Sequence, residues 1–540
     1  MTTFAHDYTE QILHRGRVFM EPVDFVPDWT DKPRKQKLYP DADRLPLGTA
    51  AYPSDASVDG GLRGATTGRL GHDLATLGAL LQDSYGLSGR RLGIQANTDL
   101  GGLPWYVDAN WSRGTASGGG LYPVSIYLVA GPSSDLVPGV YHYSPSHHAL
   151  QRLLVGDVSG DVRAALHGRC DDTDTFFVLG IKYWQNAFKY NSFSFHAVTM
   201  DVGTVLGTWS TWAGARGASV EPHLWFDEPA LAHLLGVESA AEGIHAVVPL
   251  AGPGAVTTAG PTGARVALRD QEKSKVSYGF EAVEQMQAES LEGCLDVPAA
   301  DALADALPAP TPPAASSSYV ALPPARSMPV DVRTALRRRR SSFGRFQGDP
   351  LPAADLGALL AAGQDGAITS EATPAGVRLT TLYAFVNHVE GVAPGAYRYH
   401  PAEHALEPVV TGPQGRFLQD NYFLSNYNME QAGAVIVPTV RTHAVLDALG
   451  ARGYRLVNAT VGAVSQATYT AAAALDVGCG VALGFDNISF IEALGLEESG
   501  EKPLLVMAVG HERGSEGDFG STLVRTLVDV EPALAAGGAR

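Results

Sequence analysis

The sequence lacks the features that mark disulfide-rich, zinc-binding and nucleic-acid-binding proteins. Only three cysteines occur among its 540 residues, Cys170, Cys294 and Cys479, and they show neither CxxC nor Cys/His spacing. A disulfide framework and a metal site are therefore not predicted. Acidic side chains outnumber basic ones, 57 to 39, which gives a net charge of −18. This balance argues against nucleic acid and against an anionic membrane surface as partners.

Long hydrophobic runs are missing as well. No stretch reaches the roughly 20 apolar residues of a membrane helix. Residues 1–20 carry charged side chains where a signal peptide would need an apolar core. We therefore expect a cytoplasmic protein. What the sequence does have is 45% hydrophobic against 18% charged side chains, enough to bury a large core in roughly two to four domains.

The chain contains a degenerate tandem repeat. Residues 138–150 match residues 394–406 at eight of thirteen positions, at an offset of 256. Farther on, Phe226-Asp227 recurs at an offset of 259, and upstream, residues 77–81 recur at an offset of 279. The first copy therefore holds an insertion of about 23 residues near residues 89–111. Its aromatic residues either line a substrate entrance or pack the loop down: Trp105, Tyr106 and Trp111.

Both copies show the same order of predicted elements. Hydrophobic periodicity predicts helices over 74–84 and 353–362, strands over 124–129, 176–181, 382–387 and 434–437, and long helices that begin at Phe195 and Tyr454. This is an α+β plan, with one antiparallel or mixed sheet flanked by helices in each copy. The long helices contain small residues that permit close backbone packing, as expected for central helices: Gly203, Gly207, Gly462 and Ala463.

We divide the chain into four parts on this basis. Residues 1–55 are an N-terminal extension and residues 56–290 form the first domain. Residues 291–329, rich in Pro and Ala, are read as a linker. Residues 330–540 form the second domain.

Two motifs suggest chemistry. The first is a basic and hydroxyl cluster at the start of the second copy, with Arg339, Arg340, Ser341 and Arg345. Guanidinium forks beside hydroxyl donors suit a phosphate, although a solvated basic run at a linker end would look the same. The second is the run Ser117-Gly118-Gly119-Gly120, whose bare backbone could approach a planar or anionic ligand or could be a simple turn.

Taken together, several motifs resemble one family. They are the run from Arg339 to Phe346, the run from Ser117 to Pro123, the Gly-x-Tyr-x-Tyr-x-Pro hairpin, Lys189-Tyr190 and Gly484-Phe485-Asp486. In order and spacing they resemble the FMN-dependent nitroreductase superfamily, specifically its SagB/ThcOx-type azoline dehydrogenase branch, over roughly residues 32–512. The resemblance implies a dimeric α+β fold with FMN at the interface. In this chain the two domains would form an internal pseudo-dimer, and further association into homo-oligomers stays open.

The two copies differ from this pattern in a complementary way. Gly60, Gly61 and Leu62 stand opposite Arg339, Arg340 and Ser341, and residues 373–376 stand opposite Ser117–Gly120. Trp225 replaces Gly484. The resemblance therefore implies one composite FMN site per chain, with the phosphate bound by the Arg/Ser cluster of the second copy. The ring or ribityl chain would be flanked by Ser117, Gly118, Gly119 and Gly120 of the first copy and by Gly484, Phe485 and Asp486 of the second.

The pair Lys189-Tyr190 stands where the azoline dehydrogenases carry a catalytic Lys-Tyr pair, and the second copy has Ala448 and Leu449 instead. Aromatising an azoline requires removal of a Cα proton and transfer of a hydride to the flavin, so a base is needed near the ring. By spacing alone, the pair could equally lie on the surface. Asp227 and Asp486 are expected to cap the helices that follow them.

The function implied is FMN-dependent dehydrogenation of peptide azolines to thiazoles or oxazoles during maturation of ribosomally made peptides. The implied partners are a modified precursor peptide and a cyclodehydratase complex. One alternative keeps the flavin but reduces nitro, quinone or dehydroamino-acid substrates with NAD(P)H. Another is a flavin-free module that docks a peptide.

Overall fold

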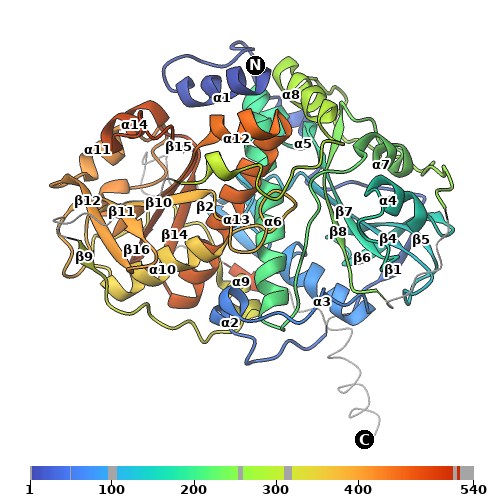
Figure 1. The fold of residues 1–540 in the computed structure, drawn as a ribbon, viewed down its shortest axis with the longest axis horizontal. Coiled ribbons are helices and arrows are strands. Elements are labelled where there is room, and N and C mark those ends of the chain that lie inside the picture. Colours follow the sequence, from blue (N-terminus) through green and yellow to red (C-terminus); the bar gives the residue numbers. More distant parts are fainter. Residues whose placement is uncertain are drawn as a thin grey trace, which may run out of the picture.

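The computed structural model describes residues 3–48, 50–94, 106–252, 260–308, 319–514 and 520–522. Two α+β lobes flank a central pair of long helices (Figure 1). The first lobe contains a six-stranded sheet in the order β1 (Asp43–Pro46), β6 (Ala149–Val155), β5 (Gly139–Ser144), β4 (Val124–Ala130), β7 (Phe176–Lys182) and β8 (Glu242–Pro249).

The second lobe repeats this plan with an eight-stranded sheet. Its order is β14 (Gly478–Ala482), β16 (Val506–Gly510), β13 (Ala434–Val440), β10 (Thr380–Val386), β11 (Gly395–His400), β12 (Ala405–Thr411) and β9 (Val320–Ala321), and β15 (Lys502–Pro503) also pairs with β13. Within the described ranges, the pairings between named strands in both sheets are antiparallel. The α+β fold class is therefore confirmed.

Helices surround the sheets and fill the space between them. In the first half of the chain they are α1 (Phe4–His14), α2 (Val58–Arg63), α3 (Leu74–Ser84), α4 (Ser159–Ala165), α5 (Trp184–Tyr190), α6 (Ser194–Gly214), α7 (Glu228–Leu235) and α8 (Glu281–Glu292). In the second half they are α9 (Val332–Arg338), α10 (Ala353–Asp365), α11 (Gly415–Asp420), α12 (Thr442–Leu449), α13 (Arg452–Leu475) and α14 (Asn487–Leu494). The helices and strands predicted from periodicity are all present, with ends that differ by a few residues.

The insertion predicted in the first copy contains a hairpin. Its strands β2 (Gly89–Ile94) and β3 (Tyr106–Ser112) pair with each other, and β2 also pairs with β17 (Gly520–Thr522) near the other end of the chain. Trp105 and the side chain of Tyr106 lie outside the described residues. Trp111 is 45% exposed and its ring lies 5.8 Å from the Arg90 guanidinium. A C-terminal strand is thus added to a first-domain hairpin.

The helices α6 and α13 run side by side through the centre of the molecule (Figure 1). They approach so closely at two glycines that no side chain would fit. A Cβ atom on Gly203 would lie 1.9 Å from the carbonyl oxygen of Ala459, and one on Gly462 would lie 2.1 Å from that of Met200. The small residues predicted on the long helices therefore form the contact between the two domains.

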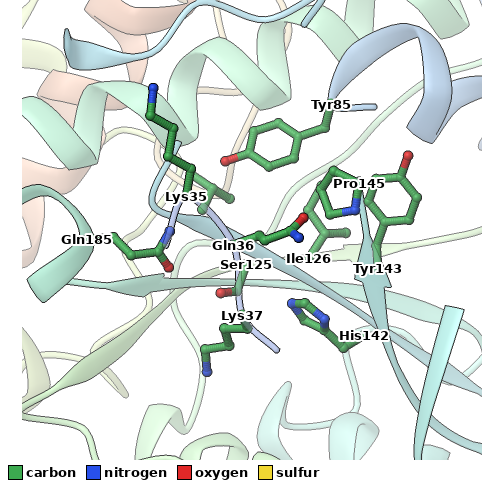
Figure 2. A pocket seen from close by; sticks show the side chains of 11 residues that line it. Lys35, Gln36, Lys37, Tyr85, Ser125, Ile126, His142, Tyr143, Pro145 and Gln185 are labelled. Atoms are coloured by element: carbon green, nitrogen blue, oxygen red, sulfur yellow. The ribbon is translucent and has the colours of Figure 1, made fainter. Parts of the chain in front are cut away.

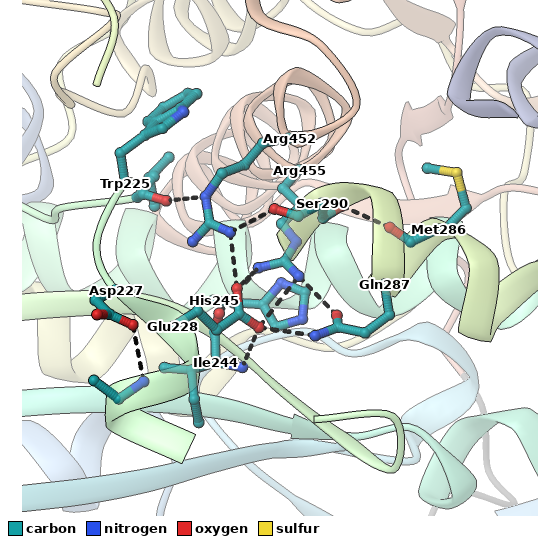
Figure 3. A network of polar contacts seen from close by, with 12 residues as sticks. Trp225, Asp227, Glu228, Ile244, His245, Met286, Gln287, Ser290, Arg452 and Arg455 are labelled. Carbon is teal, nitrogen blue, oxygen red and sulfur yellow. Dashed lines mark hydrogen bonds and ion pairs between the residues drawn. The ribbon is translucent and has the colours of Figure 1, made fainter. Parts of the chain in front are cut away.

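A buried polar network lies beside this helix pair (Figure 3). Glu228 at the start of α7 is fully buried and accepts hydrogen bonds from Arg452 and Arg455 of α13, both at 2.8 Å. Arg455 also donates to Gln287 of α8 at 2.7 Å. Burial alone would raise the pKa of Glu228, but the two guanidiniums hold it below its usual range. The network therefore pairs buried charge across the two domains.

The N-terminal segment is packed onto both domains. Helix α1 contacts α8 of the first domain and α12 and α14 of the second, with Tyr8 and Ile12 fully buried. After it, β1 extends the first sheet by pairing with β6. In the described part of the chain, no helix is long and apolar enough to cross a membrane.

The α6–α13 contact predicts the effect of Gly203→Ala. In an ordinary helix this change would stabilise by about 1 kcal/mol, because alanine has the higher helix propensity. Here the methyl group would meet the backbone of Ala459, and overpacking typically costs about 1–3 kcal/mol or more. We expect a lower midpoint of thermal unfolding for Gly203→Ala and almost no change for Ser210→Ala, which alters a partly exposed residue of the same helix. A raised midpoint for Gly203→Ala would contradict the close contact.

Candidate functional site

Asp201 of α6 binds the Ser117–Gly120 loop through two hydrogen bonds. Ser117 Oγ donates to Asp201 Oδ2 at 2.6 Å, and the Gly118 N–H donates to Oδ1 at 2.8 Å. Ser117 Oγ accepts in turn from the Tyr122 N–H at 2.8 Å. Burial raises the pKa of Asp201 to about 7, although the two hydrogen bonds from the loop oppose this rise. The loop therefore rests on a carboxyl group that titrates near neutral pH.

The next two residues of the loop, Gly119 and Gly120, carry no side chains. Gly119 and Gly120 have φ values of +63° and +65°, a region that favours glycine. A Cβ atom on Gly120 would meet no other atom within 4 Å, so this part of the loop is uncovered. The backbone is accessible to a ligand at this point.

The predicted catalytic pair lies against the same loop. A Cβ atom on Gly119 would lie 2.4 Å from the Tyr190 hydroxyl and 3.1 Å from Lys189 Nζ. The two side chains also contact each other, because Lys189 Nζ lies 4.6 Å from the centre of the Tyr190 ring. The structure thus brings together an ammonium group, a phenol and a glycine strip, although the pair lies about 70 residues farther along the chain.

Part of the Arg/Ser cluster reaches this loop from the second domain. The buried Arg339 donates from Nε to the carbonyl of Gly114 at 2.7 Å and from Nη2 to that of Arg113 at 3.0 Å. Ser341 Oγ lies 3.0 Å from the hydroxyl of Tyr469, which accepts from the Val481 N–H at 3.0 Å. Arg339 and Ser341 are therefore close to the residues that precede Ser117 and to the strand that leads to Gly484.

The other predicted residues have different surroundings. Arg340 pairs with Glu512 at 2.5 Å, and Arg345 donates to the Arg513 carbonyl at 3.3 Å. The Phe485 ring is buried against Phe490. The Asp486 side chain accepts from two N–H groups at the start of α14 and pairs with Arg17. Asp227 accepts likewise at the start of α7, so both predicted helix caps are confirmed.

Sequence reasoning missed a contribution from the N-terminal segment. The Arg15 guanidinium lies 4.4 Å from the Phe193 ring of the first domain and 5.9 Å from the Phe423 ring of the second. Phe193 packs against Tyr190, with ring centres 6.1 Å apart, and Phe423 packs over Gly484. Burial lowers the pKa of Arg15 to about 10. A lone arginine after a short helix has no sequence signal for this position between the two domains.

A narrow cavity lies in the first domain, beside strands β4 and β5 (Figure 2). It is enclosed by the segment 35–37, by Tyr85, by strands β4 and β5 and by Gln185 of α5. Its free space is about that of one water molecule. Lys35 and Lys37 point in opposite directions from their segment (Figure 2). The cavity is too small for a flavin ring and is not the predicted cofactor site.

The region that corresponds to the Arg/Ser cluster in the first copy is closely packed. A Cβ atom on Gly61 would lie 2.4 Å from the Thr211 carbonyl oxygen, and one on Gly214 would lie 2.6 Å from that of Gly61. Helix α2 is therefore packed onto the end of α6 in this region. Among the described residues, no group of three His, Cys, Asp or Glu side chains is arranged to hold a metal ion.

Comparison with known proteins identifies the fold. Residues 336–511 match the model of the nitroreductase family. Among curated proteins, none matches this sequence. A structure from Anabaena variabilis, named as a nitroreductase, is similar over 95% of this chain and 100% of its own, with 21% identity and a TM-score of 0.68. The described part of the chain therefore has this fold, and its two lobes form a fused pseudo-dimer.

Other similar structures match about one third of the chain. A protein from Ralstonia eutropha, named as a nitroreductase, covers 39% of this chain and 95% of its own, with 22% identity and a TM-score of 0.30. The McbBCD microcin synthetase complex from E. coli, with truncated pro-MccB17 bound, contains a chain that covers 33% of this chain and 70% of its own, with 19% identity and a TM-score of 0.28.

The buried Asp201 predicts a pH dependence of stability. An aspartate in the unfolded chain has a pKa near about 3.9, whereas that of Asp201 in the folded protein is about 7. Between these values only the folded state keeps the proton, so the free energy of unfolding falls as the pH rises, by at most about 1.4 kcal/mol per pH unit. Above about pH 7 this contribution is constant.

Asp201→Asn lacks this titration and keeps a side chain of similar size. The measurement is denaturant unfolding of both proteins at pH 4.5, 6 and 7.5. We expect the free energy of unfolding of the unmodified protein, minus that of Asp201→Asn, to decline over this range. Parallel pH profiles for the two proteins would show that Asp201 does not titrate as described.

Proposed function

We propose that this protein is an FMN-dependent oxidoreductase that dehydrogenates azoline rings of a peptide to azoles. The observation that carries the proposal is the position of Lys189 and Tyr190 against Gly119 of the glycine loop. The second copy has Ala448 and Leu449 at the corresponding positions. A lysine amine and a tyrosine hydroxyl beside a bare backbone strip suit proton removal from a ligand that lies on that strip, with the deprotonated member of the pair as the base.

The residues present fit an FMN group between the domains. Arg339, Arg340 and Ser341 combine guanidinium and hydroxyl donors, which is the donor set that a phosphate requires. The uncovered backbone at Gly120 could face a flat ring, and Gly484 lies on the opposite domain beside Phe423. When bound, FMN would supply a two-electron acceptor for a hydride.

The protein's own groups would act on the proton. Oxidation of an azoline removes a hydride from one ring carbon and a proton from its neighbour. The Tyr190 hydroxyl and Lys189 Nζ converge on one point of the loop. The member of the pair that is deprotonated would accept the proton, and the protonated member would stabilise the charge that develops. Asp201 would set the position of the loop through Ser117 and Gly118.

The proposal includes a setting for this reaction. The substrate would be a ribosomally made precursor peptide in the cytoplasm, after a cyclodehydratase has formed its azolines. The acidic chain, with a net charge of −18, fits a peptide partner better than nucleic acid. The Arg15 guanidinium between Phe193 and Phe423 would form one wall of the site.

The first-copy region that corresponds to the Arg/Ser cluster is closely packed at Gly61 and Thr211. This packing predicts one FMN per chain. Flavin absorbance against protein concentration should give a ratio near one. Arg340→Ala with Ser341→Ala should weaken FMN binding by about a hundredfold or more, since hydrogen bonds to charged groups contribute about 1.5–3 kcal/mol each. Arg63→Ala is the matched control, because Arg63 lies beside the corresponding region of the first copy and pairs with Asp365. A ratio near two would contradict the single site.

The Lys-Tyr pair predicts a loss of chemistry without a loss of cofactor. Lys189→Ala with Tyr190→Phe should keep the flavin spectrum, while the oxidation of an azoline peptide under air, followed as a loss of 2 Da per ring, slows by about 10²- to 10⁴-fold. The control is Lys273→Ala with Tyr319→Phe, which changes the same residue types away from the site. The unmodified protein could instead bind FMN, leave azolines intact and consume NAD(P)H with a nitro or quinone substrate. That result would contradict azoline oxidation and support the reductase alternative.

A further inference from the structure

A second group of reactive side chains lies away from the glycine loop. Cys170 Sγ is 3.1 Å from His223 Nε2, and His223 Nδ1 is 3.0 Å from Glu371 Oε1. Cys170 and His223 belong to the first domain and Glu371 belongs to the second. A thiol, an imidazole and a carboxylate in this order have the arrangement that activates a cysteine nucleophile.

The surroundings determine which nitrogen of His223 carries the proton. The Glu371 carboxylate can only accept, so Nδ1 must be the donor to Oε1, and Nε2 of the neutral ring is left to accept from the Cys170 S–H. Glu371 is itself held by the Leu224 N–H at 3.0 Å and by Arg169 Nη1 at 2.7 Å. The contact with Glu371 therefore orients Nε2 toward Sγ. Burial alone would lower the pKa of His223, but Cys170 and Glu371 raise it to about 9, which favours transfer of a proton from Sγ to Nε2.

A second cation near the thiol, Arg69, is paired with carboxylates. Arg69 packs beside this turn and pairs with Asp172 at 2.8 Å and with Glu221 at 3.4 Å. Cys170 is 1% exposed, but it lies in a turn whose next residues, Asp171 and Asp172, are exposed. The thiol therefore lies in a turn whose following residues are at the surface.

The position of this group in the fold is also informative. The loop with Cys170 follows α4 as the loop with Tyr422 follows α11, and Trp225 corresponds to Gly484 in the repeat. Glu371 precedes residues 373–376, which correspond to Ser117–Gly120. The three side chains thus come from the loops that are related by pseudo-symmetry to those of the glycine-loop site.

We propose that Cys170, His223 and Glu371 form a thiol reaction site at the position related to the glycine-loop site by the pseudo-symmetry of the two lobes. Its reactants are small oxidants of the peroxide class. His223 Nε2 takes the proton from Cys170, and the sulphur attacks one oxygen of hydrogen peroxide. The O–O bond breaks as the S–O bond forms, and the departing hydroxide takes the proton from His223 and leaves as water. The sulphur is oxidised to a sulphenic acid and the peroxide is reduced.

The chain contains its own controls for this proposal. All three cysteines are buried, with exposures of 1% for Cys170, 4% for Cys294 and 2% for Cys479, so exposure gives Cys170 no advantage. Burial raises the pKa of the Cys479 thiol well above its usual range, and the described residues provide it with no histidine hydrogen bond. A difference in rate among the three thiols therefore reports on the groups around them.

The test is mass spectrometry of the full-length protein after brief treatment with hydrogen peroxide and a sulphenic-acid trap. We expect labelling of Cys170 at least tenfold faster than labelling of Cys294 or Cys479. His223→Gln should slow Cys170 by about a hundredfold, as loss of a general base does, and Glu371→Gln should slow it less. Labelling of Cys170 no faster than the other two would overturn the proposal, and so would an unchanged rate in folded His223→Gln. The comparison within the unmodified chain decides the question even if a variant does not fold.

Discussion

The contact between the backbones of α6 and α13 is the constraint on which the rest of the structure depends. Gly203 and Gly462 carry no side chains, so each helix lies directly against the backbone of the other. This spacing brings first-domain residues 113–116 onto Arg339 and Gln466 of the second domain. The residues before the glycine loop contact the Arg/Ser cluster at Arg339 because the two lobes meet at this distance.

Two buried carboxyl groups beside these helices show how surroundings determine charge. Glu228 is buried with two guanidiniums, which lower its pKa against the effect of burial. Asp201 is buried with only a hydroxyl and an N–H donor, and burial raises its pKa to about 7. The first group pairs charge across the domains, whereas the second supports a loop with a proton that is exchangeable near neutral pH.

The pseudo-symmetric halves of the molecule have become chemically different. On one side, the uncovered Gly120 backbone faces Lys189 and Tyr190. On the other, Gly61 is packed against Thr211, and the Glu371 carboxylate binds the segment around His223 and Leu224. The Glu371 carboxylate thus joins the two lobes at this position. The two halves of the repeat therefore have two environments with different side chains.

The sequence by itself determined the α+β plan, the tandem repeat and the elements of each copy, because hydrophobic periodicity and repeated motifs are local properties of the chain. It also indicated the close helix contact through Gly203 and Gly462. Only the tertiary structure decided which side chains meet. It placed Arg15 between Phe193 and Phe423, and it brought Cys170 to His223 and Glu371. These contacts join residues up to about 400 positions apart. Their geometry depends on how the two domains pack, which no spacing along the chain records.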